Sequence, residues 1–285
     1  MTSFRVSSVL KFEIWDRRCT IIAAFWGNRK AVSLFRIRVF TTNHLSSLFD
    51  SAVALVYPQA CAVCGQSVES CTDGVACSAC WNATRIFDSE DTLCWKCGAF
   101  TPASISEDRR KNVRCGRCDE DSYSAARAVG FYEGALRASI LSLKREPHIA
   151  RRLTQLMLTA QQREPINQAT LIIPVPLHPE RERERGFNQA AVLARSLSRL
   201  SNLRFDEHSV MRRVHTALHR AGMDARARRD SVADAFAIRY PEGIAGQSIL
   251  LIDDVFTTGA TASACAAKLK EAGATEVFVL TVARA

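Results

Sequence analysis

The sequence has no apolar run of the roughly 18 to 20 residues that a membrane-spanning helix needs. Its most hydrophobic stretches, AVALVY and SILLI, are short and soon interrupted. We also find no secretory signal, because charged residues are scattered through the N-terminal stretch where its apolar core would lie. These absences argue against membrane-spanning and secreted classes, and we expect a soluble, cytoplasmic protein.

Two common nucleotide-binding motifs are absent as well. Neither G-x-x-x-x-G-K-[ST] nor G-x-G-x-x-G occurs, which excludes a P-loop and a dinucleotide site of the usual kind. Few aromatic residues interleave with the basic ones, which weakens a model of base stacking on the surface. The chain does carry a formal net charge of +9, typical of a protein with an anionic partner.

The 285 residues, 47% of them hydrophobic, suffice for one sizeable core and a smaller module. Residues 1–43 are basic and patchily apolar, and we expect them to form a poorly structured extension. Residues 44–121 begin with an apolar, helix-like lead-in over 44–57 and then become rich in cysteine. Residues 122–285 form the remaining predicted domain.

Eight of the eleven cysteines fall into four C-x-x-C pairs. Each pair puts two thiolates on one tight turn, within reach of a tetrahedral zinc ion at about 2.3 Å. Disulfides would need an oxidising compartment, and a redox-active C-x-x-C normally occurs once. We therefore predict two structural zinc ions, held by Cys61, Cys64, Cys77, Cys80, Cys94, Cys97, Cys115 and Cys118. Consecutive pairing is the simpler topology, and interleaved pairing remains open.

Three cysteines lie outside the pairs. Cys71 has no second cysteine at C-x-x-C spacing and is either a bystander or a substitute zinc ligand. Cys19 and Cys265 are lone thiols, and Cys265 falls inside a predicted helix, where a small buried hydrophobic residue is the expected role.

Strand-like and helix-like segments alternate after residue 124. Strands are predicted at 126–134, 170–177, 234–238, 247–255 and 276–283, and helices at 135–144, 150–162, 187–200 and 259–273. This alternation predicts an α/β fold, a mostly parallel sheet flanked by helices. In such sheets the ligand binds outside the carboxyl ends of the strands.

The stretch LIDDVFTTGAT places two carboxylates at such a strand end. Asp253 and Asp254 repel each other and are costly to hold there unless a cation or hydrogen-bonding ligand meets them. The threonine- and glycine-rich turn that follows opens a predicted helix, where backbone N–H groups and hydroxyls can bind a phosphate.

This stretch resembles the phosphoribosyl diphosphate signature of type I phosphoribosyltransferases. By that resemblance Asp253 and Asp254 hold the ribose hydroxyls, and either could also assist as a base. The 5-phosphate is then cradled by Thr257, Thr258, Gly259, Ala260 and Thr261.

PVPLHPERERERGFNQA at 174–190 and the SLK that ends at Lys144 are similar to segments of the ComF family. Members of that family join a cysteine-rich zinc ribbon to a phosphoribosyltransferase-like domain, and the match covers 45–285. It places four cations at the diphosphate, in a loop where guanidinium groups suit phosphate: Lys144, Arg181, Arg183 and Arg185. The alternative is that ERERER is a solvated, self-paired charged turn.

Two functions are compatible with these patterns. The first is a phosphoribosyltransferase-fold protein that binds phosphoribosyl diphosphate with Mg²⁺ and transfers or releases the phosphoribosyl group; the resemblance to the ComF family implies that it serves DNA uptake in natural transformation. The second is a non-catalytic accessory protein that binds single-stranded DNA through its positive charge and a basic flap at 211–230. DNA-uptake proteins are expected partners in both cases.

Overall fold

The computed structural model describes residues 11–15, 20–24, 35–36, 59–102, 105–213 and 235–285. It consists of two compact units, Met1–Val53 and Ala54–Ala285. The predicted lead-in helix at 44–57, Cys19 and most of the predicted basic flap lie outside the described residues.

The first unit contains a small antiparallel sheet of β1 (Lys11–Trp15), β2 (Thr20–Ala24) and β3 (Phe35–Arg36). These strands fall in the segment that we expected to be poorly structured. The alternation of polar and apolar residues in KFEIW suits a strand. The remainder of 1–43 is not described, so the prediction for it stays a prediction.

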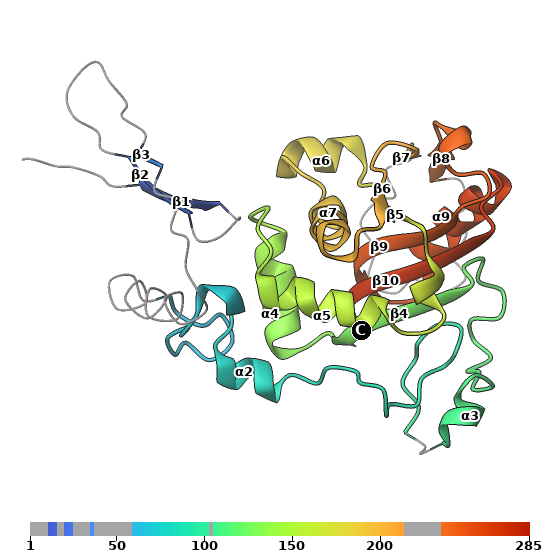
Figure 1. The fold of residues 1–285 in the computed structure, drawn as a ribbon, viewed down its shortest axis with the longest axis horizontal. Coiled ribbons are helices and arrows are strands. Elements are labelled where there is room, and N and C mark those ends of the chain that lie inside the picture. The colour runs from blue at the N-terminus through green and yellow to red at the C-terminus, as the bar shows by residue number, and fades with distance from the viewer. Residues whose placement is uncertain (1–10, 16–19, 25–34, 37–58, 103–104, 214–234) are drawn as a thin grey trace, which may run out of the picture. The chain divides into compact units, whose positions relative to one another are not determined.

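The second unit is built on a five-stranded sheet in which every strand pairs in parallel with its neighbours (Figure 1). The strand order across the sheet is β4 (Ala125–Phe131), β10 (Glu276–Arg284), β9 (Ser248–Phe256), β5 (Leu171–Pro174) and β6 (Arg204–Phe205). The prediction of a mostly parallel α/β sheet is confirmed.

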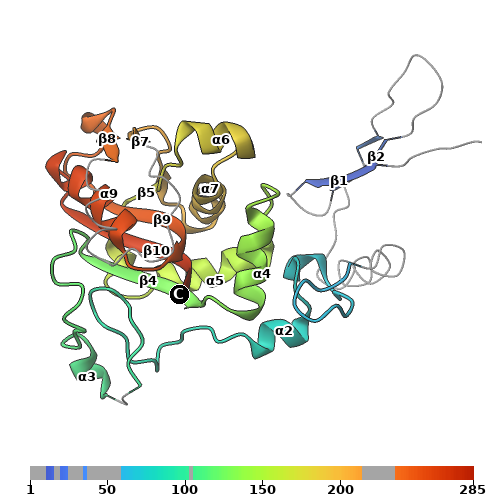
Figure 2. The same cartoon turned by 180° about the vertical axis from the view of Figure 1, so that it is seen from behind.

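Helices cover both faces of this sheet (Figures 1 and 2). One face carries α4 (Gly134–Leu143), α5 (Arg151–Gln161) and α7 (Gln189–Ser201). The other carries α9 (Ala260–Glu271) with a two-stranded antiparallel sheet of β7 (Val210–Arg212) and β8 (Phe236–Ile238). Along β9, Leu250 and Ile252 belong to the first core, whereas Ile249 and Leu251 belong to the second. A strand buried on both faces must be apolar throughout, which explains the unbroken ILLI run.

The connections leave β5 and β9 in opposite directions. After β5 the chain forms α6 (Pro179–Arg185) and α7 and continues into β6, whereas after β9 it forms α9 and continues into β10 on the other side. The carboxyl ends of two adjacent strands thus become a topological switch point, where open α/β sheets bind their ligands.

The cysteine pairs lie on opposite faces of the sheet. The first two pairs and α2 (Ser78–Ala83) contribute to the core beneath α4 and α5, and the turn η1 (Cys71–Asp73), none of whose residues is buried, lies between these pairs in the chain. The last two pairs, which flank α3 (Glu107–Arg110), contribute to the core beneath α9. Residues on both sides of the predicted boundary at 121 therefore share the same two cores.

The segment that joins the two ribbons crosses the edge strand β4. Ile86 pairs with Gly130 as an antiparallel bridge, and the N–H of Phe87 donates to the carbonyl of Val129 at 2.8 Å. This pairing covers an otherwise open sheet edge. Two short 3₁₀ turns, η2 (Ile166–Gln168) and η3 (Pro241–Gly243), complete the described elements of this unit. No described helix is long and apolar enough to cross a membrane.

Gly130 is the position at which this crossing is most sensitive to side-chain size. A Cβ there would lie 2.3 Å from the carbonyl oxygen of Arg85 and 2.9 Å from Cδ1 of Leu136. We expect Gly130→Ala to lower the free energy of unfolding in urea by about 2–3 kcal/mol, because the backbone of the crossing segment has to move. Gly243→Ala is the control, since its nearest atom is 3.5 Å away. Equal losses in the two variants would contradict the close approach.

Candidate functional site

The eight paired cysteines form two clusters of four. Cys61, Cys64, Cys77 and Cys80 make one, and Cys94, Cys97, Cys115 and Cys118 make the other, with all ligand atoms of a cluster within 4.8 Å of one another. The pairing is therefore consecutive, which decides between the two topologies that the sequence left open. Cys71 is exposed and lies in neither cluster, which agrees with the bystander role.

The spacing of the sulfur atoms fits zinc. Neighbouring Sγ atoms lie 3.5–3.7 Å apart in the second cluster, and those of Cys64 and Cys77 are 3.7 Å apart. A tetrahedron with bonds of about 2.3 Å has edges of about 3.8 Å, whereas a disulfide requires about 2.05 Å. Four thiolates leave no open position, so both sites suit structural zinc.

Two buried or half-buried arginines accompany the second cluster. Arg127 is 5% exposed and donates from Nη1 to the carbonyl of Trp95, between two ligands. Burial lowers its pKa to about 10, while the charge of Cys94 opposes this shift. Arg284 donates from Nη1 to the carbonyl of Cys97 at 2.6 Å. Such cations offset the negative charge of a four-thiolate site.

Asp253 and Asp254 lie on β9 just beyond the end of β5, because Pro174 pairs with Ile252. Successive strand residues point to opposite faces, so the two side chains have different surroundings. Asp254 is 8% exposed, and its Oδ2 lies 3.2 Å from Nζ of Lys144, the residue that ends α4. The structure thus brings together a predicted acid and a predicted cation from distant parts of the chain.

Asp253 is partly buried on the side of α9. Its Oδ1 accepts a hydrogen bond from the N–H of Asp254 at 2.8 Å. Burial, and next the charge of Asp254, raises the pKa of Asp253 to about 8. The charge of Asp253 in turn raises the pKa of the buried Cys265, after burial itself. Cys265 is 0% exposed, as expected for a small core residue.

A cation that we did not predict from the sequence lies within electrostatic reach of Asp253. Burial lowers the pKa of Arg212, at the end of β7, while Asp253 opposes the shift and Arg181 adds to it. Asp253 and Arg181 therefore both lie within electrostatic reach of Arg212. The sequence offered no signal for Arg212, because it stands in a run of basic residues with no periodicity.

The turn after β9 has the form that the sequence predicted. Gly259 is the N-cap of α9 with φ of 82°, a conformation that favours glycine, and a Cβ there would lie 2.8 Å from Cζ of Phe256. Thr257 and Thr258 are exposed, and Thr261 is half-buried in the first turn of the helix. Ala260 is buried, and its N–H donates to Oγ1 of Thr258 at 3.4 Å. The exposed hydroxyls and the helix N-terminus thus lie at one end of α9.

The arginines of ERERER lie on a short helix, α6, and not in the loop that we expected. His178 caps this helix by accepting from the N–H of Glu180, Pro179 begins it, and Gly186 ends it with φ of 82°. Arg183 is exposed, whereas Arg181 and Arg185 are half-buried. Arg185 donates from Nη1 to Oε1 of Gln189.

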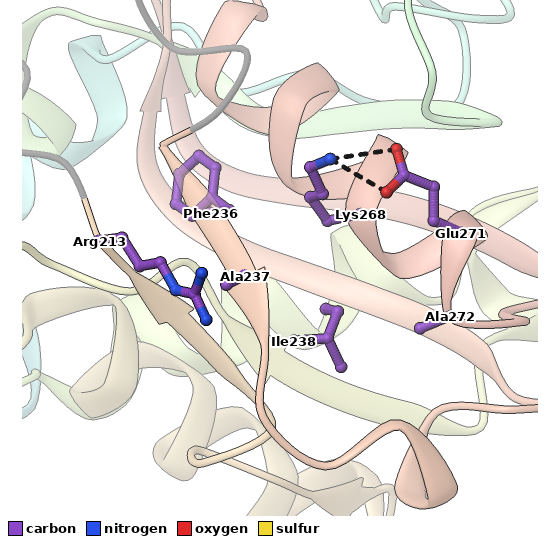
Figure 3. A pocket seen from close by; sticks show the side chains of 7 residues that line it. All are labelled: Arg213, Phe236, Ala237, Ile238, Lys268, Glu271 and Ala272. Carbon is purple, nitrogen blue, oxygen red and sulfur yellow. Dashed lines mark hydrogen bonds and ion pairs between the residues drawn. The ribbon is translucent and has the colours of Figure 1, made fainter.

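A pocket of about 450 Å³ lies elsewhere, between β8 and the second half of α9 (Figure 3). Arg213, Phe236 and Ile238 line one side of it. On the other side Nζ of Lys268 is 3.0 Å from a carboxylate oxygen of Glu271. None of the predicted site residues lines this pocket, so it is separate from the acids of β9.

Comparison with known proteins agrees with this architecture. The double zinc ribbon domain matches residues 52–119. The chain is 33% identical to DNA utilization protein YhgH of Shigella flexneri over 238 residues, 81% of this chain and 99% of that protein. It is 29% identical to Competence protein F of Haemophilus influenzae over 234 residues, 79% and 96% of the two chains. The chain belongs to the ComF family. It is also 36% identical to Competence protein ComFC of Bacillus subtilis over 103 residues, 36% of this chain and 39% of that protein.

Among solved structures, the glutamine phosphoribosylpyrophosphate amidotransferase of B. subtilis matches with a TM-score of 0.31. That match has 16% sequence identity and covers 45% of this chain and 25% of that one. A likeness of this size supports no conclusion about this ComF-family chain.

The raised pKa of Asp253 gives the folded protein a defined pH dependence. An ordinary aspartate has a pKa of about 4, so between about pH 4 and pH 8 the folded state binds more protons at this site than the unfolded state. The free energy of unfolding therefore falls as pH rises through this window. We expect Asp253→Asn to flatten the fall and to gain about 1–3 kcal/mol relative to wild type between pH 5 and pH 8.

Asp206→Asn is the matched control with the opposite sign. Although burial raises the pKa of Asp206, hydrogen bonds from Ser209 and His208 lower it below its usual value. Its stabilising contribution is therefore present at neutral pH and is lost in acid. Urea denaturation measures the effect of Asp253 between about pH 4 and pH 8 and that of Asp206 below about pH 4. Parallel pH profiles for wild type and Asp253→Asn would contradict the buried, protonated state.

Proposed function

We propose that this ComF-family protein binds phosphoribosyl diphosphate, or a related sugar phosphate, at the carboxyl end of β9 and transfers or releases the phosphoribosyl group. The observation that carries the proposal is the ion pair between Lys144 and Asp254, beside a turn that opens α9. One strand end thus brings together a buried carboxylate, a lysine from a distant part of the sequence and a helix N-terminus. This combination suits a ligand with hydroxyls and phosphates.

The 5-phosphate binds at the turn in this proposal. Its oxygens accept from backbone N–H groups and hydroxyls of Thr257–Thr261, and the positive end of the helix dipole favours the anion. The exposed Thr257 leaves its hydroxyl open to a ligand, and the exposed Thr258 lies beside it. Gly259 provides the left-handed turn that this arrangement requires.

The diphosphate binds on the side of the basic residues. Lys144 and Arg181 supply charge there, and Arg185 supplies further positive charge from the last turn of α6. The forked N–H donors of arginine match the oxygens of a phosphate. This match favours a role in diphosphate binding over a solvated, self-paired charged segment. Arg212 joins this set, because Asp253 and Arg181 both lie within electrostatic reach of it.

Asp253 and Asp254 hold the sugar hydroxyls and a magnesium ion. Oδ2 of Asp254 is buried and accepts no hydrogen bond from the described residues, so its ion pair with Lys144 leaves capacity for another partner. Oxygen donors of this kind suit Mg²⁺, which usually takes most of its ligands from substrate phosphates and water. The ion would neutralise part of the diphosphate charge.

In the reaction, the bond between ribose C1 and the diphosphate oxygen breaks, and a bond forms from C1 to a nucleophilic acceptor, whose proton leaves. The protein positions the two substrates, neutralises the leaving diphosphate and excludes water. With its pKa raised to about 8, Asp253 is suited to exchange a proton near neutral pH.

We also propose a role in DNA uptake during natural transformation, which is supported by relatives named for competence and for DNA utilization. We propose a cytoplasmic protein that works with DNA-uptake partners. The second candidate is a non-catalytic protein that binds single-stranded DNA. The formal net charge of +9 favours it, because a polyanionic strand binds largely through neutralised phosphates.

Calorimetric titration with phosphoribosyl diphosphate, with and without Mg²⁺, tests the proposal. We expect binding that depends on Mg²⁺ and weakens at least about tenfold in Lys144→Ala, because a charge-assisted contact is lost. Arg181→Ala should weaken binding as well. Arg183→Ala is its matched control, since Arg183 is exposed on the same helix. Zinc content should remain at two per chain in every variant.

Complete absence of binding to wild type would contradict the proposed function. A protein that only binds DNA gives a different pattern. Its affinity for a single-stranded oligonucleotide falls steeply with salt, and Asp254→Asn leaves that affinity unchanged.

A further inference from the structure

Phe256, the last residue of β9, lies between two side chains that are tied to the second zinc site. Its ring meets the ring of Tyr123 edge-on with centroids 5.9 Å apart, and the guanidinium of Arg284 lies 4.6 Å from its centroid. Phe256 is 4% exposed, and its carbonyl accepts from the N–H of Ala285 at 3.0 Å. The next three residues, 257–259, form the turn that opens α9.

Tyr123 is held by the end of the second ribbon. Its hydroxyl donates to Oδ2 of Asp121 at 2.6 Å, and the N–H of Asp121 donates to the carbonyl of Cys118 at 3.1 Å. Tyr123 and Asp121 are 1% and 8% exposed, so both contacts are shielded from water. A short buried chain of contacts therefore leads from a zinc ligand to Phe256.

Arg284 provides a second link to the same site. Nη1 donates to the carbonyl of Cys97 at 2.6 Å, and Nη2 lies 3.8 Å from Sγ of Cys97. Four thiolates around a zinc ion carry a net charge of about −2, which holds a neighbouring guanidinium in place.

The same region contacts the turn and the first turn of α9 directly. A Cβ on Gly259 would lie 2.8 Å from Cζ of Phe256 and 3.3 Å from the hydroxyl of Tyr123, so these two side chains border the turn. The N–H of Ser122 donates to Oγ of Ser263 at 2.9 Å. Residues at or next to the second ribbon thus contact the turn region in three places: at Phe256, which ends β9, at the ring of Tyr123, and at Ser263 in the first turn of α9.

The first ribbon has equivalent contacts on the opposite face of the sheet. Arg152 pairs with Asp73 at 3.0 Å and lies 5.1 Å from the ring centroid of Trp81. Oγ1 of Thr84 accepts from the N–H of Ala135 at 2.9 Å. These contacts lead to α4 and α5, and not to the turn at 257–259.

We propose that the metal ion at the second four-cysteine site sets the conformation of the turn at 256–259. Phe256, Tyr123 and Arg284 act as positioning residues between the two. The ion at the first site has no such effect. One consequence rests on the proposed function: if the turn binds a phosphate, metal binding at the second site and anion binding favour each other, since such coupling is reciprocal.

Hydrogen exchange tests the link without any ligand. We expect Arg284→Met to raise the exchange rate of amides in 256–263 at least about fivefold, with two zinc ions per chain retained. Arg284→Lys keeps the cation and should restore much of the protection. The matched control is Arg152→Met, which removes a cation beside an aromatic ring at the first ribbon and should leave 256–263 unchanged.

Tyr123→Phe provides a milder break in the same link, since it keeps the ring and loses the bond to Asp121. Should Arg284→Met fail to fold, we expect the same rise in exchange, in smaller measure, from this variant. The inference is overturned if neither variant changes exchange at 256–263, or if Arg152→Met raises it as much as Arg284→Met does.

Metal release separates this inference from the proposed function. We expect inorganic phosphate or ribose 5-phosphate to slow transfer of one zinc ion of the two to a chromogenic chelator at least about fivefold, and Arg284→Met to remove that protection. No effect of either anion in wild type, with the exchange result intact, would count against phosphate binding and leave the positional link standing. Phosphate binding to wild type, with no change in hydrogen exchange at 256–263 in the variants, would support the phosphate site and contradict the positional link.

Discussion

The structure depends on one constraint: the strand β9 must be apolar on both faces and still end in two carboxylates. Ile249–Ile252 are fully buried between two layers of helices, and Asp254 follows them at 8% exposure. A carboxylate in that position is unfavourable unless it is paired. Lys144 provides the pairing from the end of α4, so the position of α4 and the charge state of the strand end are mutually dependent.

The two zinc ribbons help to bury β9 from opposite faces of the sheet. Each four-cysteine cluster completes one of the two cores, and the segment that joins them pairs with β4 across the sheet edge. Small ribbons have too little apolar surface to fold alone and draw stability from metal binding. Here they also shape the sheet domain, most directly where Tyr123 and Arg284 border Phe256.

Much of this arrangement could be predicted from the sequence, since local patterns dictate it. The unbroken apolar run of β9, the C-x-x-C spacings and the Thr-Thr-Gly turn each fix a structure within a few residues of chain. The contacts between distant segments could not be predicted. Nothing local to Arg212, Arg284 or Tyr123 indicates which group they meet, because these meetings depend on strand order and on which face each ribbon covers. The helix α6 was missed for another reason: its repeating charges obscured the cap at His178 and the stop at Gly186.

The measurement that tests the central claim most directly is the number of protons released when phosphoribosyl diphosphate and Mg²⁺ bind. Titration near pH 7.5 in buffers of different ionisation enthalpy gives this number. With a pKa raised to about 8, Asp253 is partly protonated in the free protein at this pH, and a cation bound beside it must lower that pKa. The account predicts net proton release in wild type that disappears in Asp253→Asn. Binding with equal proton release in the two proteins would contradict a site built on the paired acids of β9.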